Sequence, residues 1–195
     1  MYKSPRTIAL DLEGVVAKSQ ERVIQLFNAS DGAMPAHNGM LRNYDMTQFL
    51  RYTNGEHISR EQLLGLFAEA WKNPRRIMMV DDNIPTILDG LDSWKILIAT
   101  TTAGNPDNVS KFFEMNRITV DRIKFFETEE EKIKAIVSNS DMRAYVDDNP
   151  AVALKVAEAG KLSFCLNIYS RNVGRHKNLT TVRDWEELQI RLLRL

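Results

Sequence analysis

Short apolar runs alternate with longer amphipathic stretches along most of the chain. Short runs bounded by polar residues are typical of buried strands, and apolar residues spaced by three and four are typical of helices. The runs predict strands at Thr7–Leu10, Lys95–Ala99, Lys124–Phe126, Ala144–Val146 and Leu162–Ile168. Helical patterns follow at Val109–Met115, Glu129–Val137, Ala151–Ala159 and Val182–Leu195. This alternation predicts an α/β fold, with a doubly wound parallel sheet and right-handed crossovers.

The interval between the first two predicted strands is unusually long. About 80 residues separate Asp11 from Lys95, whereas a crossover with its helix needs about a dozen. The interval holds helical patterns at Glu21–Ala29, Tyr44–Tyr52 and Arg60–Trp71, the last with Ser59 as a candidate N-cap. We therefore expect residues 18–78 to form a small helical insertion on a core of residues 1–17 and 79–195. An insertion at this point would lie over the end of the first strand, like a lid.

Composition narrows the class of protein. Hydrophobic residues make up 44% and charged residues 27%, and 26 basic residues balance 26 acidic ones. We expect a soluble cytoplasmic protein with no nucleic-acid polymer and no membrane as partner. The start of the chain has no apolar stretch that would suit a signal peptide. Cys165, the single cysteine, lies in an apolar run, which favours a buried core residue. The sequence gives no indication of oligomeric state.

Charge appears where the first predicted strand ends. The apolar run Ile8–Leu10 is followed by Asp11, Leu12, Glu13 and Gly14. Burying an ion costs several kcal/mol unless it is paired or bound to a metal, so two acids here need a functional reason. Gly14 permits a sharp turn directly after them. The acids would lie at the carboxyl edge of the sheet, where open α/β folds bind their ligands.

Two further strands also end in functional groups. Thr100, Thr101 and Thr102 follow the second strand, and Asp147 and Asp148 follow the fourth. A helix that contains a lysine lies between them in sequence. Clustered carboxylates suit a hard cation such as Mg²⁺, a hydroxyl can bind a phosphate oxygen, and a lysine offsets the anionic charge. A carboxylate can itself attack phosphorus. The set therefore indicates phosphoryl transfer on a small phosphorylated substrate.

The ordered motifs resemble those of the haloacid dehalogenase-like (HAD) phosphohydrolases. They read Asp-Leu-Glu-Gly-Val, Leu-Ile-Ala-Thr, a lysine, and Tyr-Val-Asp-Asp-Asn-Pro, and together they span most of the chain outside the insertion. The insertion after the first motif resembles the cap of the C1 subclass. The first and last motifs are most similar to the 5′(3′)-deoxyribonucleotidase-like branch. The resemblance implies a Rossmann-like core and a magnesium-dependent phosphatase.

The resemblance also implies roles for three residues of the first motif and the lysine helix. Asp11 would be the nucleophile that forms an aspartyl-phosphate. Glu13 would be the general acid and base, with its backbone carbonyl facing the metal. Lys132 would be the catalytic, substrate-facing lysine, preferred to Lys134 because apolar residues follow it at i+3 and i+4.

The other two motifs would complete the site. Thr100 would bind the transferring phosphoryl group, with Thr101 as the alternative. Asp147 and Asp148 would bind Mg²⁺ together with Asp11, one directly and one through water.

Glu13 is where the chain departs from the family pattern, which has aspartate at this position. The extra methylene lengthens the reach by about 1.5 Å. Enolase-phosphatases of the same superfamily are similar in carrying Asp-Ile-Glu-Gly, so glutamate is compatible with turnover. We expect a phosphatase acting on a small phosphomonoester, with a nucleotide 5′-monophosphate as the leading candidate. The alternatives are a HAD-like binding or regulatory protein with impaired catalysis, and a phosphotransferase.

Three other features have structural explanations that we prefer. Val80-Asp81-Asp82-Asn83 nearly duplicates the motif at Asp147, but Asp82 and Asn83 are expected to cap the helical pattern at Ile87–Leu91. Trp71 is expected to pack inside the insertion, with stacking on a base as the second interpretation. Arg171 lies in a basic loop after the last predicted strand, from which it could reach a substrate phosphate.

Overall fold

The fold is an α/β fold built on one parallel sheet, as the pattern predicts. The computed structural model describes residues 6–42, 45–169 and 171–195. Within them, six parallel strands lie in the order β3-β2-β1-β4-β5-β6. The strands are β1 (Arg6–Leu10), β2 (Trp94–Thr100), β3 (Arg122–Phe125), β4 (Met142–Asp147), β5 (Leu162–Leu166) and β6 (Leu179–Val182).

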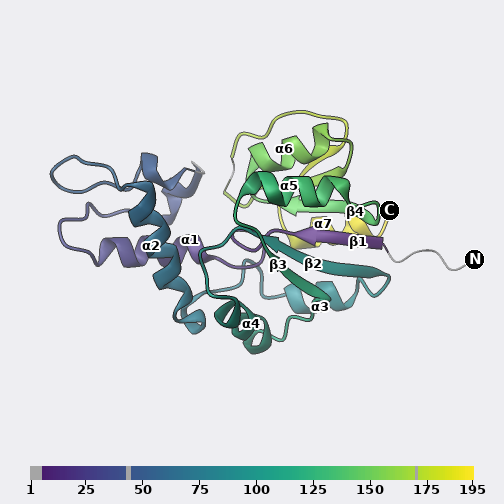
Figure 1. Cartoon of the computed structure of the whole chain (residues 1–195), viewed down its shortest axis with the longest axis horizontal. Coiled ribbons are helices and arrows are strands. Elements are labelled where there is room, and N and C mark those ends of the chain that lie inside the picture. Colours follow the sequence, from purple (N-terminus) through teal and green to yellow (C-terminus); the bar gives the residue numbers. More distant parts are fainter. Residues whose placement is uncertain (1–5, 43–44, 170) are drawn as a thin grey trace, which may run out of the picture.

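Helices cover both faces of this sheet (Figure 1). They are α1 (Ser19–Asn28), α2 (Arg60–Trp71), α3 (Ile84–Asp89), α4 (Pro106–Met115), α5 (Glu129–Ser138), α6 (Pro150–Glu158) and α7 (Trp185–Leu192). Short 3₁₀ turns are η1 (Asn38–Arg42), η2 (Met46–Gln48) and η3 (Pro74–Arg76). One buried cluster joins the sheet to α3, α4 and α7, and another joins it to α5 and α6. Among the described residues, no helix is long and apolar enough to cross a membrane.

Strand β1 lies at the centre of the sheet and shows how the two faces are made. Ile8 and Leu10 belong to the cluster under α3, α4 and α7, whereas Ala9 belongs to the cluster under α5 and α6. All three are fully buried, which explains the uninterrupted apolar run. Successive strands are added on one side of β1 as far as β3, and then on its other side from β4 to β6. Ligands are expected at such a switch point, here at the carboxyl ends of β1 and β4.

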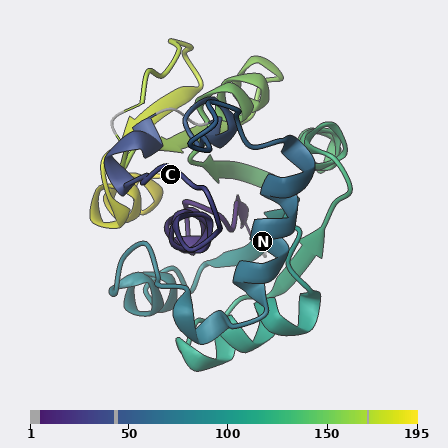
Figure 2. The same ribbon diagram turned by 90° about the vertical axis from the view of Figure 1, so that its left-hand side faces the viewer.

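The inserted segment, residues 18–78, lies beyond the carboxyl ends of the strands (Figure 1). Figure 2 looks onto this side, with α1 seen end-on and α2 beside it. The two helices pack on a buried cluster of their own. Ser59 forms the predicted cap: its hydroxyl accepts the Gln62 N–H at 3.1 Å, and its own N–H donates to the Gln62 side chain at 2.9 Å. The limits of the insertion at 18 and 78 stay a prediction.

The helix predicted at Tyr44–Tyr52 is wrong. Tyr44 lies outside the described residues, and the rest contains only η2, followed by isolated bridges that involve Arg51 and Tyr52. The Asp45 carboxylate accepts hydrogen bonds from both the N–H and the hydroxyl of Thr47, at 3.0 and 2.7 Å. These local bonds favour a short capped turn over a continuous helix.

The end of the chain also differs from the prediction. Val182 does not begin the last helix but ends β6, an edge strand, and α7 starts at Trp185. The Asp184 side chain caps that helix by accepting the Glu187 N–H at 2.8 Å. Strand β5 correspondingly ends at Leu166, two residues before the predicted limit. Two threonines occupy the middle of β6, so this strand contains no apolar run and the pattern did not predict it.

The turn before α3 is built differently from the prediction. Asn83 occupies the N-cap position, but its side chain makes no capping hydrogen bond. The Asp81 carboxylate instead accepts the Asn83 N–H at 2.8 Å. Asp82 is exposed. The near-duplicate of the Asp147 motif is therefore a surface turn.

Candidate active site

Asp11 and Lys132 meet at the carboxyl edge of the sheet. Asp11 follows β1 directly and is held there by its N–H, which donates to the Val146 carbonyl at 2.9 Å. Lys132 reaches it from α5, with Nζ 3.0 Å from Oδ1 of Asp11. Lys132 is 1% exposed, whereas Lys134 on the same helix faces solvent. The geometry thus brings together the preferred member of the two lysines and the expected nucleophile.

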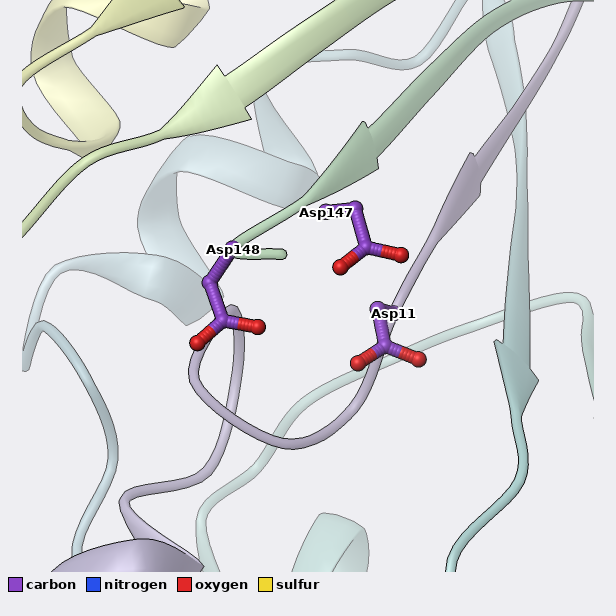
Figure 3. A group of neighbouring side chains, drawn as sticks. All are labelled: Asp11, Asp147 and Asp148. Carbon is purple, nitrogen blue, oxygen red and sulfur yellow. The ribbon is translucent and has the colours of Figure 1, made fainter. Parts of the chain in front are cut away.

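Asp11, Asp147 and Asp148 converge from two neighbouring strands (Figure 3). One carboxylate oxygen from each lies within 4.8 Å of the others, and all three residues are buried. Burial raises the pKa of Asp11 above its usual value, and Lys132 only partly offsets this effect. Burial likewise raises the pKa of Asp148 to about 7. Such a group of acids is costly without cations close by.

Lys132 supplies one of these cations. Its Nζ also lies 3.4 Å from Oδ2 of Asp147 and 3.1 Å from Oε2 of Glu129. Burial opposes the charged form of Lys132, but the surrounding carboxylates outweigh it and hold the pKa above its ordinary value. The ammonium group therefore stays charged inside the site.

Arg171 supplies a second cation. Its Nη1 donates to the Asp148 carboxylate at 2.7 Å and to the Asp148 backbone carbonyl at 2.6 Å. Its Nε donates to the Leu41 carbonyl at 3.2 Å, so the same guanidinium joins the acidic site to the inserted segment. In the structure Arg171 contacts Asp148 and the inserted segment, and its contact with a substrate phosphate stays a prediction.

Gly14 allows the turn after β1 to pass close to Asp148. Its φ is +80°, a conformation that residues with a side chain rarely adopt. A Cβ at this position would lie 2.0 Å from Oδ2 of Asp148. Only glycine fits here, for both reasons.

Glu13 is not one of the three converging carboxylates and has its own hydrogen-bond partners. Its Oε1 accepts the indole N–H of Trp71 at 3.1 Å and also accepts the Thr102 hydroxyl. Burial raises the pKa of Glu13, and these two hydrogen bonds lower it in part. The prediction that its backbone carbonyl faces a metal stays a prediction. Trp71 is not packed inside the insertion as expected, because its ring belongs to the cluster under α3, α4 and α7.

The two candidate threonines have different hydrogen-bond partners at the sheet edge. The Thr101 hydroxyl donates to Oε1 of Glu129 at 2.7 Å, on the side of Lys132. Thr100 is fully buried, and its hydroxyl oxygen accepts the Thr102 N–H at 3.1 Å. Thr100 ends β2 and Thr101 lies just beyond it. Which of the two hydroxyls contacts a phosphoryl group stays a prediction.

The acidic group fits a magnesium ion. Oδ1 of Asp148 is buried and has no hydrogen-bond partner among the described residues. Asp147 is engaged at both oxygens: Oδ1 accepts the Asn149 N–H at 2.7 Å, and Oδ2 accepts the Tyr145 hydroxyl. Mg²⁺ in proteins is usually bound by one or two carboxylates, water and substrate phosphate. Asp11 and Asp148 are thus the better direct ligands, and Asp147 suits contact through water.

A cavity of about 380 Å³ opens between the site and the inserted segment. Its lining combines site residues, apolar side chains and polar groups: Glu13, Gln20, Leu41, Asp45, Met46, Thr47, Arg60, Leu63, Phe67 and Arg171. The cavity is large enough for a small organic ligand next to Glu13.

Several site residues were not identified from the sequence. Tyr145 could have been found, because it lies two residues before Asp147 on β4 and alternation puts both on one face. Trp71 had no such signal, since 58 residues separate it from Glu13. Thr102 and Glu129 lie near predicted site residues, but their partners come from other elements.

Comparison with known proteins places the fold. No protein-family model and no curated protein matches the chain. Among solved structures it is similar to a haloacid dehalogenase-like family hydrolase from Streptococcus pneumoniae, with a TM-score of 0.61 and 12% identity over 95% of this chain and 97% of that one. It is also similar to a predicted phosphoglycolate phosphatase from Haemophilus somnus, with a TM-score of 0.65 and 10% identity over 96% and 98%.

A third similar structure was determined with magnesium bound. It is a HAD hydrolase from Bacillus subtilis, with a TM-score of 0.59 and 12% identity over 98% of this chain and 100% of that one. Dehalogenases are also among the matched structures. The architecture is therefore the HAD fold, as the motifs predicted, and the neighbours span more than one hydrolytic chemistry.

Proposed function

We propose that this protein is a magnesium-dependent phosphatase that hydrolyses a small phosphomonoester through an aspartyl-phosphate on Asp11. The observation that carries the proposal is the group of three buried carboxylates beside Lys132 at the carboxyl edge of the sheet. Carboxylate oxygens suit Mg²⁺, and the lysine offsets the charge when a carboxylate and a phosphate approach each other.

The residues support a two-step reaction. In the first step an oxygen of Asp11 attacks phosphorus, the bond to the leaving oxygen breaks, and Glu13 gives that oxygen a proton. In the second step Glu13 takes a proton from water, the water oxygen attacks phosphorus, and the bond to Asp11 breaks. Lys132 and Thr100, with Thr101 as the alternative, would hold the phosphoryl oxygens. Asp11 and Asp148 would bind Mg²⁺ directly, and Asp147 would contact it through water. The bound ion would neutralise phosphate charge during both steps.

The acidic group favours a phosphatase over a dehalogenase. Displacing a halide from carbon with one carboxylate needs no cation site. Here Asp147, Asp148 and Glu129 lie with Asp11 around the two cations Lys132 and Arg171, so the carboxylates are in excess and a bound cation would offset the remaining charge. A phosphate substrate explains why the site would hold a metal.

The cavity supports a proposal for the position of the leaving group. It adjoins Glu13, which would protonate the leaving oxygen. Its walls include apolar Leu63 and Phe67, and Arg60 provides a cation. We propose a small organic leaving group at this place, in keeping with a C1-type cap formed by residues 18–78. A nucleoside, as in the 5′(3′)-deoxyribonucleotidase-like branch, is the first to test.

The test is phosphate release from a panel of phosphomonoesters, including nucleoside 5′-monophosphates, with MgCl₂ or with EDTA. We expect activity that requires Mg²⁺ and falls by a factor of about 10⁴ or more in Asp11→Asn. Asp82→Asn is the matched control, because Asp82 belongs to the exposed near-duplicate motif. Equal rates in wild type and Asp11→Asn, or no release from any substrate, would contradict the proposal.

A further inference from the structure

Glu13 is held by two donors that meet on the same oxygen. The Trp71 indole N–H and the Thr102 hydroxyl both donate to Oε1. The Thr102 hydroxyl oxygen in turn accepts the Gly104 N–H at 3.1 Å. The hydroxyl proton is thereby directed at Glu13, and the three groups form a polarised chain of hydrogen bonds.

Trp71 is itself fixed from several sides. The residue is fully buried, and its ring meets Phe112 edge to face with centroids 5.7 Å apart. A Cβ on Gly104 would lie 2.6 Å from Cγ of Trp71, so the ring lies directly against the Gly104 backbone. The indole N–H therefore has a defined direction, unlike a donor on a mobile surface side chain.

Trp71 also stands where the inserted segment meets the core. It is the last residue of α2. Its neighbour Ala70 packs in the cluster of the inserted segment, whereas Trp71 packs in the cluster under α3, α4 and α7. The hydrogen bond to Glu13 thus joins the end of α2 to the turn after β1.

We propose that Trp71 and Thr102 are positioning residues that hold the Glu13 carboxylate at the cavity. By fixing the longer side chain, this pair allows glutamate to act where the HAD pattern has aspartate. The inference rests on the proposed function. An aspartate would end about 1.5 Å short and would not reach both donors. Because the cavity begins at Glu13, loss of either donor would leave the carboxylate misplaced relative to the leaving group.

The kinetic test compares variants that remove one donor each. Trp71→Phe keeps an aromatic ring but loses the N–H, and Thr102→Val keeps the shape but loses the hydroxyl. We expect kcat to fall about 10–100-fold in each, with KM changed less than about threefold, because a misplacement near 1 Å costs about that much. Glu13→Asp should fall similarly, and Thr102→Ser should recover most of the rate. Trp94→Phe, at the other end of the sheet, is the matched control.

A second test needs no activity. In ¹⁵N-labelled protein the Trp71 indole N–H resonance is identified by its loss in Trp71→Phe. We expect this resonance to shift in Glu13→Ala and in Thr102→Val, while the Trp94 and Trp185 resonances stay in place. An unchanged Trp71 resonance in Glu13→Ala would overturn the inference.

The two tests separate the possible failures. Shifted resonances with no phosphatase activity in wild type would mean that the proposed function is wrong while Trp71 and Thr102 still hold Glu13. Wild-type activity with full kcat in both donor variants would mean that the phosphatase is real and the positioning is not needed. A kcat that rises in Glu13→Asp would also overturn the inference. It would support the alternative that glutamate at this position impairs catalysis.

Discussion

Lys132 shows how much one residue decides in this site. Its ammonium group lies among the carboxylates of Asp11, Glu129 and Asp147, and it is almost fully buried. Apolar residues at i+3 and i+4 favoured it over Lys134 at the level of sequence, since a buried helix face carries them. The same burial makes Lys132 important for stability as well as for charge balance.

Lys132→Met should destabilise the fold strongly. Removing one partner of a buried ion pair leaves uncompensated charge and costs about 3–5 kcal/mol. Lys134→Met, on the exposed side of the same helix, should change the free energy of unfolding by less than about 0.5 kcal/mol. Chemical denaturation of both variants at pH 7 checks this. Similar small losses in the two variants would show that the Lys132 ion pairs contribute little.

At the scale of elements, the turn after β1 controls the geometry of the acids. Gly14 combines a positive φ with a close approach to Asp148, and the two effects can be separated. Gly55 has a similar φ of +88°, but an added Cβ there would meet nothing within 4 Å. The chain therefore offers a natural control for backbone strain alone.

Gly14→Ala should cost more than Gly55→Ala. Forcing a side chain into the left-handed region costs about 1–2 kcal/mol, which is the full loss expected for Gly55→Ala. At Gly14 the added methyl must also displace Asp148, so we expect at least about 2 kcal/mol more. Thermal or chemical unfolding of both variants measures the difference. Equal losses would mean that the loop after β1 moves freely away from Asp148.

The elements themselves divide into those with a strong local signal and those without. Strands β1, β2 and β4 are buried on both faces, and their unbroken apolar runs predicted them. Edge strand β6 has two threonines at its centre, so it lacked such a run. The segment Tyr44–Tyr52 carried a helix-like pattern, but the local hydrogen bonds of Asp45 gave a short turn.

For the whole molecule, the acidic site joins the sheet to the inserted segment. Asp148 lies at its centre, bonded to Arg171, which also contacts Leu41. A cation bound at Asp11 and Asp148 would act only on the folded chain, because the two residues are far apart in sequence. Metal binding and global stability are therefore linked.

Mg²⁺ should raise the unfolding temperature of the whole protein. At a hundredfold excess over its Kd, a ligand of the folded state adds about 2.7 kcal/mol, or about 5–10 °C for a chain of this size. The shift should vanish in Asp148→Asn and persist in Asp82→Asn. Scanning fluorimetry with and without Mg²⁺ measures this. A shift of equal size in Asp148→Asn would place the metal elsewhere.

The sequence by itself determined the α/β class, most strands of the sheet and the motif residues at three strand ends. Those features are local, because burial imposes apolar runs and a strand must carry its functional groups where it ends. Tertiary structure decided which side chains meet. It brought Thr101 to Glu129 across 28 residues, and it brought Trp71 to Glu13 across 58 residues. Such contacts depend on how separate elements pack, which no local pattern records.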